Sequence, residues 1–225
     1  MKESTARLVH DLGIRVPALE NCVGPVGDAV ELVLECYSED HGIIACGNGG
    51  SAADSLHIVG ELCKAFALPR PISEYDTQRL STVFGDDTGE VSSKLQRGLR
   101  AMSLVSESAL ITAYSNDVSP DYAFAQQVYT YGRAGDVLVC ISTSGNSKNV
   151  VLAAMVGQAF GLHTLALTGG SGGRLAQVAE ISIVVPEIEV FRVQELHLPI
   201  YHTICLAVEN ELFGGLAGQV NETVL

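Results

Sequence analysis

The sequence is poor in basic residues. Lysine and arginine together number 13, against 26 aspartates and glutamates, and the formal net charge is -13. Binding to a nucleic-acid backbone depends on clustered lysine and arginine, so this composition argues against nucleic acid as a general partner. A small phosphate ligand stays compatible with it, because backbone N–H groups bind phosphate without any cation.

Long hydrophobic runs are also missing. No run of about 18 apolar residues is present, so we expect no membrane-spanning helix and no membrane partner. The first residues, MKESTARLVHDLG, lack the apolar stretch of a signal peptide. We therefore expect a soluble, cytoplasmic protein.

No two cysteines have the CxxC spacing of redox and zinc sites. The six cysteines lie at positions 22, 36, 46, 63, 140 and 205, and several of them, such as Cys46 and Cys140, fall in apolar segments. This distribution favours buried free thiols in a reducing compartment over disulfides or a cysteine metal site.

Apolar residues, by contrast, are abundant. They make up 47% of the 225 residues, which is enough for a sizeable core, and we expect one domain spanning 1–225. The mean hydropathy of +0.27 is high for a monomer and predicts apolar surface buried between subunits.

The predicted elements alternate between strands and helices. Strands are expected at 43–46, 109–114, 137–141, 163–167 and 181–185. Helices are expected over most of 1–38, with a break at Gly24-Pro25, and at 51–66, 121–131, 147–160, 172–178 and 194–212. The strands are continuous apolar runs, which is typical of a parallel sheet covered on both faces. The sequence predicts an α/β fold, a three-layer doubly wound sandwich of the flavodoxin-like kind, with an N-terminal helical extension.

Two segments fall outside this pattern. Residues 69–98 are polar with scattered proline and glycine, and we expect an irregular excursion with one short helix near 90–99. This excursion could form a lid, extend a subunit interface or be a plain surface loop. The tail 216–225 is expected to be frayed.

Two glycine-rich turns join predicted strands to predicted helices. They read GNGGS at 47–51 and STSGNS at 142–147. In doubly wound folds such turns lie at the carboxyl ends of the strands, where ligands bind. Neither turn matches a P-loop or an ordinary GxGxxG motif. Helix capping would explain one such turn, whereas two in one sheet, rich in hydroxyls and helix N-terminal N–H groups, favour a phosphate site.

Two polar pairs lie at helical spacing behind these turns. His57 and Glu61 are four residues apart and share one face of a helix. Gln194 and His202 are eight residues apart, at about 80° around a helix axis. Imidazole and oxygen ligands of this kind suit zinc or a similar divalent ion. From spacing alone, however, a surface hydrogen bond explains the first pair better, and the second spacing carries little information.

The motifs GNGGSAAD, STSGNS and QELHLPIYH together resemble those of the sugar isomerase (SIS) domain family. The resemblance covers about residues 20–68 and 100–213, and it is strongest to the branch that isomerises phosphorylated heptoses. It implies an aldose–ketose isomerase that converts sedoheptulose 7-phosphate into D-glycero-D-manno-heptose 7-phosphate, a lipopolysaccharide precursor. Members of this branch are tetramers, so a homotetramer is implied as well.

The resemblance also implies a role for each matching residue. The phosphate group would be held by Ser142, Thr143, Ser144 and Ser147. The rest of the substrate would contact Asn48, Gly49, Gly50, Ser51, Glu61, Asn116, Asp117 and Gln194. Glu61 and His202 would be the acid/base pair that moves protons through an enediol. One zinc ion would be bound by His57, Glu61, Gln194 and His202. His197 is offset from the matching position, and we expect it to be structural or to support a metal ligand from behind.

Two features depart from the family pattern. The family usually has an aspartate three residues before the metal-binding glutamine, where this chain has Phe191. Glu187 and Glu189 lie just upstream and are candidates to compensate. The second departure is the length of residues 69–98, which puts the identity of the sugar in question.

Two alternatives to this function stay open. One is an isomerase of the same fold that acts on a different sugar phosphate. The other is a non-catalytic SIS-domain protein that binds a sugar phosphate or a replication initiator. The presence of both Glu61 and His202 argues against the second, and the short, acidic N-terminal region argues against a DNA-binding regulator.

Overall fold

Five parallel strands form one sheet at the centre of the molecule. In the computed structural model, which describes residues 1–85 and 88–214, the strand order is β2-β1-β3-β4-β5. The strands are β1 (Ile43–Gly47), β2 (Ala101–Ser103), β3 (Val137–Ile141), β4 (His163–Gly169) and β5 (Ile181–Val185). Residues 86–87 and the predicted tail 216–225 lie outside the described residues. The expected doubly wound α/β fold is confirmed.

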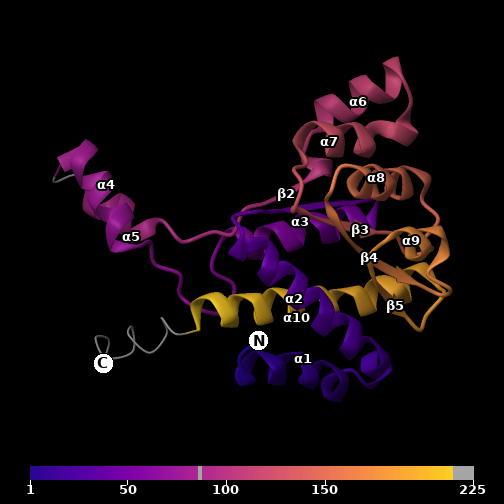
Figure 1. Cartoon of the computed structure of the whole chain (residues 1–225), viewed down its shortest axis with the longest axis horizontal. Helices are drawn as coiled ribbons and strands as arrows, with labels where there is room; N and C mark the ends of the chain where they lie inside the picture. Colours follow the sequence, from indigo (N-terminus) through magenta and orange to yellow (C-terminus); the bar gives the residue numbers. More distant parts are fainter. Residues whose placement is uncertain (86–87, 215–225) are drawn as a thin grey trace.

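Helices cover both faces of the sheet (Figure 1). One face carries α1 (Glu3–Arg15), η1 (Pro17–Cys22), α2 (Val23–Ser38), α3 (Gly50–Cys63) and α10 (Val190–Phe213). The other carries η3 (Leu104–Ser106), α6 (Ser108–Asp117), η4 (Pro120–Tyr122), α7 (Ala123–Tyr131), α8 (Lys148–Ala159) and α9 (Gly173–Val178). All five residues of β1 and of β3 are buried, as expected for strands with helices on both sides.

The register of the central strands sets the position of the two glycine-rich turns. Strand β1 pairs with β3 in parallel, with Gly47 opposite Ile141. Each of these residues is the last of its strand, so the turns that follow them leave the sheet side by side. The helix α3 follows the first turn and α8 follows the second.

The long helix α10 continues through Pro199. The hydroxyl of Thr203 donates to the Pro199 carbonyl at 2.8 Å, and eleven residues of the helix are buried. Across the described residues, we find no helix with both the length and the apolarity needed to span a bilayer.

Two predicted elements are wrong. Residues 109–114, expected as a strand, lie within the helix α6, and the second strand of the sheet is β2. The break in the N-terminal helices falls at Val16 and not at Gly24-Pro25. Pro25 does not interrupt α2, because it lies in the first turn of that helix, where its missing N–H is not needed.

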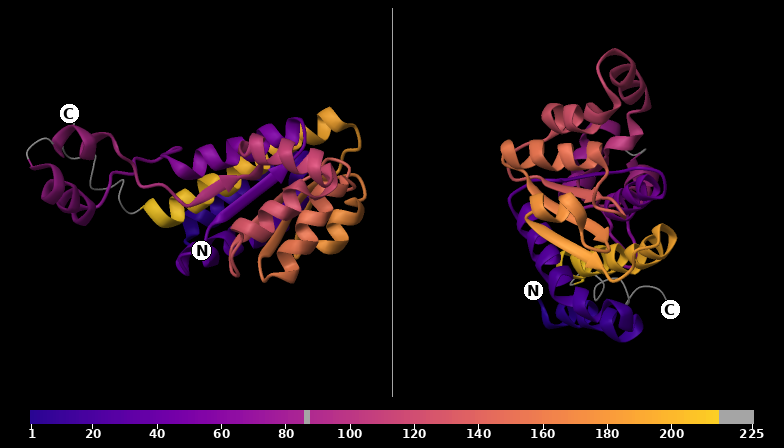
Figure 2. Two further views of the ribbon diagram at one scale, coloured as in Figure 1. Left: turned by 90° about the horizontal axis from the view of Figure 1, so that it is seen from above. Right: turned by 90° about the vertical axis from the view of Figure 1, so that its right-hand side faces the viewer.

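Residues 69–98 form an arm that stands away from the rest of the molecule (Figures 1 and 2). It contains two helices, α4 (Glu74–Phe84) and α5 (Thr88–Lys94), of which only α5 was expected. The Ser73 side chain caps α4 by accepting from the Asp76 N–H at 3.0 Å. No residue of α4 is buried and Thr88 is the buried residue of α5, so these two helices add little to the core, whereas Arg70 at the base of the arm is buried.

A buried histidine generates a prediction about stability. His197 is 0% exposed, its Nε2 lies 3.4 Å from the Thr168 carbonyl, and burial lowers its pKa from 6.5 to about 4. The unfolded chain therefore binds this proton near pH 6.5, and the folded chain does so only near pH 4. The stability contributed by the neutral ring, about 3 kcal/mol, is fully present above the unfolded pKa and is lost as the pH falls through this window.

We expect His197→Gln to show a smaller fall in the free energy of unfolding between pH 7 and pH 4.5 than the wild type. Urea unfolding at several pH values measures this fall. His10→Gln, a change at an exposed histidine of α1, serves as the control. Equal falls in wild type and His197→Gln would contradict the prediction.

Candidate active site

The turn GNGGS needs its glycines for steric reasons. Gly49 has φ +57° and ψ -120°, a conformation that strongly favours glycine. A Cβ on Gly47 would lie 2.5 Å from the Ser51 carbonyl oxygen. A Cβ on Gly50 would lie 2.3 Å from Nε2 of Gln194, so the absence of a side chain brings α10 against this turn. GNGGS therefore packs closely against the first turns of α10.

The turn STSGNS is held by its own hydroxyl groups. The Ser142 hydroxyl donates to Oγ of Ser147 at 2.9 Å and accepts from the Ser147 N–H at 3.4 Å. Gly145 has φ +65°, and a Cβ there would lie 1.9 Å from the Gly172 carbonyl. Ser142 is buried, whereas Ser144 is exposed and Thr143 and Ser147 are half-buried. The outer hydroxyls and the N-terminus of α8 are therefore open to an anion.

A reciprocal pair of amides joins the two turns. The side chain of Asn48 donates to Oδ1 of Asn149 at 2.8 Å, and Asn149 donates to Oδ1 of Asn48 at 3.0 Å. The first residue belongs to GNGGS and the second to the first turn of α8. These bonds fix the distance between the two turns, so they form one surface.

The helices α3 and α10 run parallel and in register. Gly50 faces Gln194, His57 contacts Tyr201, and Phe66 donates its backbone N–H to Glu209. Each contact joins residues 143 or 144 positions apart, so successive residues of α3 lie beside successive residues of α10. This register places the predicted residues of α3 opposite those of α10.

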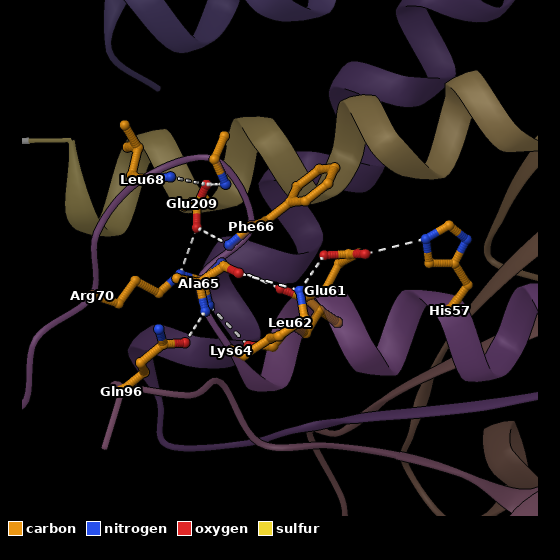
Figure 3. Close-up of polar contacts among 11 residues, drawn as sticks. His57, Glu61, Leu62, Lys64, Ala65, Phe66, Leu68, Arg70, Gln96 and Glu209 are labelled. Carbon is orange, nitrogen blue, oxygen red and sulfur yellow. Dashed lines mark hydrogen bonds and ion pairs between the residues drawn. The ribbon is translucent and has the colours of Figure 1, made fainter. Parts of the chain in front are cut away.

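Three of the predicted catalytic or metal-binding residues lie together in this register. His57 Nε2 lies 3.1 Å from Oε1 of Glu61, and the two side chains face one another in Figure 3. The ring of His202 meets the ring of His57 edge to face, with centroids 4.9 Å apart. Nε2 of His202 is buried and has no hydrogen-bond partner within residues 1–85 and 88–214. An unpaired buried nitrogen next to an imidazole and a carboxylate is a feature that a ligand would satisfy.

The charges around this cluster shift its pKa values in known directions. Burial raises the pKa of Glu61, but Lys64, whose Nζ lies 2.9 Å from Oε2, outweighs it together with His57 and holds the pKa below its ordinary value. Burial and the neighbouring His57 lower the pKa of His202, and Glu61 opposes them. The cluster thus offers a carboxylate and a neutral imidazole at neutral pH, which is the pairing that proton transfer requires.

The donors of this cluster suit zinc, since two imidazoles and a carboxylate are common zinc ligands. The orphaned nitrogen of His202 is consistent with a missing ligand. Among the described residues, however, no three side chains of His, Cys, Asp or Glu converge as a formed metal cluster. Gln194 lies against Gly50, two turns before His202. The zinc site remains a prediction, with a suitable donor set.

The remaining predicted residues lie apart from this cluster. Asn116 and Asp117 are exposed at the end of α6, where Asn116 donates to Asp117 at 2.9 Å, and no hydrogen bond of the described chain joins them to either turn. Glu187 and Glu189 pair with Arg192, at 3.9 and 2.9 Å. Phe191 is exposed, and compensation by Glu187 and Glu189 stays a prediction.

A buried carboxylate closes the end of α3, as Figure 3 shows. Glu209 accepts from the backbone N–H groups of Phe66, Ala67 and Leu68 at 2.8–3.0 Å. It also accepts from Arg70 Nε at 2.7 Å, and both side chains are at most 1% exposed. Arg70 in turn donates to the carbonyls of Leu62 (2.9 Å) and Glu61 (3.3 Å), the last turn of α3. The helix end that carries Glu61 is therefore fixed to α10.

Sequence reasoning missed four residues of this region. Asp54 and Tyr201 could have been suspected, because Asp54 lies three residues before His57 and Tyr201 is inside the motif QELHLPIYH. Nothing in the sequence marks Arg70 and Glu209 as partners, since 139 residues separate them.

Comparisons with known proteins show what the chain is similar to. A family model described as "SIS domain" matches residues 87–169. The phosphoheptose isomerase of Akkermansia muciniphila is 34% identical over 96% of this chain and 100% of its own length. That of Citrifermentans bemidjiense is 38% identical over 87% of this chain and 89% of its own. The solved structure of phosphoheptose isomerase from Neisseria gonorrhoeae has a TM-score of 0.70 at 33% identity, covering 92% of this chain and 94% of its own.

The buried pair predicts a large effect on stability. Glu209→Gln leaves the Arg70 guanidinium buried without its counter-charge and removes an acceptor from the end of α3, so we expect a loss of about 3–5 kcal/mol. Urea unfolding measures it. The surface change Glu180→Gln, in an exposed pair with His163, should cost less than about 1 kcal/mol. A loss below about 1 kcal/mol for Glu209→Gln would show that the pair does not hold this helix end.

Proposed function

The chain belongs to the phosphoheptose isomerase family of SIS-domain proteins, and on this premise we propose that it isomerises sedoheptulose 7-phosphate to the aldose D-glycero-D-manno-heptose 7-phosphate. One observation of the structure supports the reaction class most directly. Glu61 and His202, from two different helices, lie in one cluster with His57, further along the helix α3 that begins in the turn GNGGS. We argue each part of the reaction from these residues.

The phosphate group binds at STSGNS. The exposed hydroxyl of Ser144 and the half-buried hydroxyls of Thr143 and Ser147 supply donors around the N-terminus of α8. Lys148 follows this turn but pairs with Asp121 at 2.6 Å, so the neutral donors carry much of the phosphate binding. The amide pair between Asn48 and Asn149 then directs the sugar along GNGGS, toward the cluster on α3 and α10.

Isomerisation moves one proton between C1 and C2 and one between their oxygens. The carboxylate of Glu61, which its neighbours keep ionised, takes a proton from C1 of the ketose and returns it to C2. His202, whose Nε2 has no partner in the described part of the chain, moves the proton between the two oxygens of the enediol. The atoms balance, since substrate and product are isomers.

A metal ion fits the donors on this surface. His57, Glu61, Gln194 and His202 would hold a zinc ion. Bound there, zinc would supply Lewis-acid polarisation of the substrate carbonyl.

We expect purified protein to form aldose product from sedoheptulose 7-phosphate, as followed by anion-exchange chromatography. Glu61→Gln and His202→Ala should each lower kcat by about 10²–10⁴-fold, because each removes a proton-transfer group. Ser144→Ala should act mainly on KM, since it removes a phosphate donor. Treatment with a chelator, followed by addition of zinc, tests whether turnover requires the metal ion.

Glu180→Gln is the matched control, because it changes a surface carboxylate far from the cluster, and it should keep wild-type kinetics. Six-carbon ketose phosphates are assayed in parallel. Turnover of these alone would keep the reaction class and replace the heptose. No turnover of any ketose phosphate, or full activity in Glu61→Gln, would refute the proposed function.

A further inference from the structure

A chain of three hydrogen-bonding groups lies behind His57. Tyr201 of α10 is 2% exposed, and its hydroxyl lies 3.0 Å from Nδ1 of His57. The same hydroxyl donates to Oδ1 of Asp54 at 3.3 Å. Asp54 and His57 are three residues apart on α3, so both face α10 and the tyrosine hydroxyl lies between them. On its other side, His57 meets Glu61 at 3.1 Å.

The protons along this chain can be counted. A tyrosine hydroxyl has one proton, and an ionised carboxylate only accepts. Oδ2 of Asp54 is buried with no partner, so the Tyr201 hydroxyl is the donor that this carboxyl group has in the described chain. If Tyr201 donates to Asp54, it must accept from His57, and this requires a proton on Nδ1. A neutral ring then has no proton on Nε2, the nitrogen that faces Glu61.

We propose that Tyr201 and Asp54 are positioning residues that hold His57 as its Nδ1-protonated tautomer, with a bare Nε2 directed at Glu61. A bare nitrogen facing a carboxylate at 3.1 Å is a pair of acceptors with no proton between them. Such a pair is completed by a cation, either a proton or a metal ion. A protein group that fixes the tautomer of a metal-binding histidine raises metal affinity, and losing it typically costs 10–100-fold.

The opposite arrangement is the competing hypothesis. If Nε2 carries the proton and donates to Glu61, then Nδ1 must accept from Tyr201. Asp54 would then have no donor for either oxygen and would have to be protonated. The two arrangements differ in which ring nitrogen of His57 is protonated, and that can be measured directly.

The test is a long-range ¹H–¹⁵N correlation spectrum of ¹⁵N-histidine-labelled protein, at a pH high enough to leave the His57 ring neutral. His57→Gln assigns the signals. We expect a protonated Nδ1 and a bare Nε2 in the wild type. Tyr201→Phe and Asp54→Ala should each shift the ring toward the Nε2-protonated tautomer, in which it donates to Glu61.

Tyr129→Phe is the matched control, because it removes the hydroxyl of an exposed tyrosine that packs against Phe160. It should leave the tautomer unchanged. A bare Nδ1 in the wild type, or the same tautomer in wild type and Tyr201→Phe, overturns the proposal. Tyr201→Phe keeps the buried ring, and circular dichroism confirms its fold before the spectra are compared.

The expected effect of Tyr201 and Asp54 on zinc affinity rests on the proposed function, whereas the proposed tautomer of His57 does not. Titration with zinc alone, without substrate, should give a dissociation constant 10–100-fold higher for Tyr201→Phe than for wild type and Tyr129→Phe. If the wild type binds no zinc, the predicted metal site fails while the spectra still decide the tautomer. If zinc binds equally to all three proteins, the positioning role toward metal is refuted.

Discussion

The site depends on one buried carboxylate. Glu209 of α10 accepts three backbone N–H groups just after α3 and one from Arg70, which in turn binds the last carbonyls of α3. The Glu209 carboxylate is at most 1% exposed, and a charge so deeply buried is tolerated only with several donors. These donors fix the position of α3 relative to α10. That position sets the parallel register, in which Gly50 meets Gln194 and His57 meets Tyr201.

The sheet supplies the second constraint. Because β1 and β3 are neighbours in register, their turns emerge together, and the amides of Asn48 and Asn149 link them. The hydroxyl-rich turn therefore lies beside the start of α3, and the cluster of His57, Glu61 and His202 lies toward the other end of that helix. A phosphorylated sugar is a ligand with two such ends, an anion and a carbonyl, so the arrangement and the family membership indicate the same class of substrate.

Local patterns allowed much of this to be predicted from the sequence. Continuous apolar runs identified four of the five strands, and glycine, serine and asparagine after two of them identified the turns. The strand predicted at 109–114 was wrong because its apolar, partly β-branched residues are compatible with a helix as well as with a strand. The strand β2 was missed because it has three residues and is defined only by its pairing with Ile43–Ala45. The Arg70–Glu209 pair could not be predicted from the sequence, because its members are far apart in the chain and such pairing leaves no periodic pattern.

The arm of residues 69–98 leaves and rejoins the body at nearly one point. The Arg70 carbonyl accepts from the Arg97 N–H at 2.7 Å, and Gln96 accepts from the Ala65 N–H at 2.9 Å. Since closing a longer loop at fixed ends costs little extra entropy, the number of residues between these ends is nearly independent of the fold of the body. Beyond Arg70, the arm is therefore a module whose length can change without displacing the helices that carry Glu61 and His202.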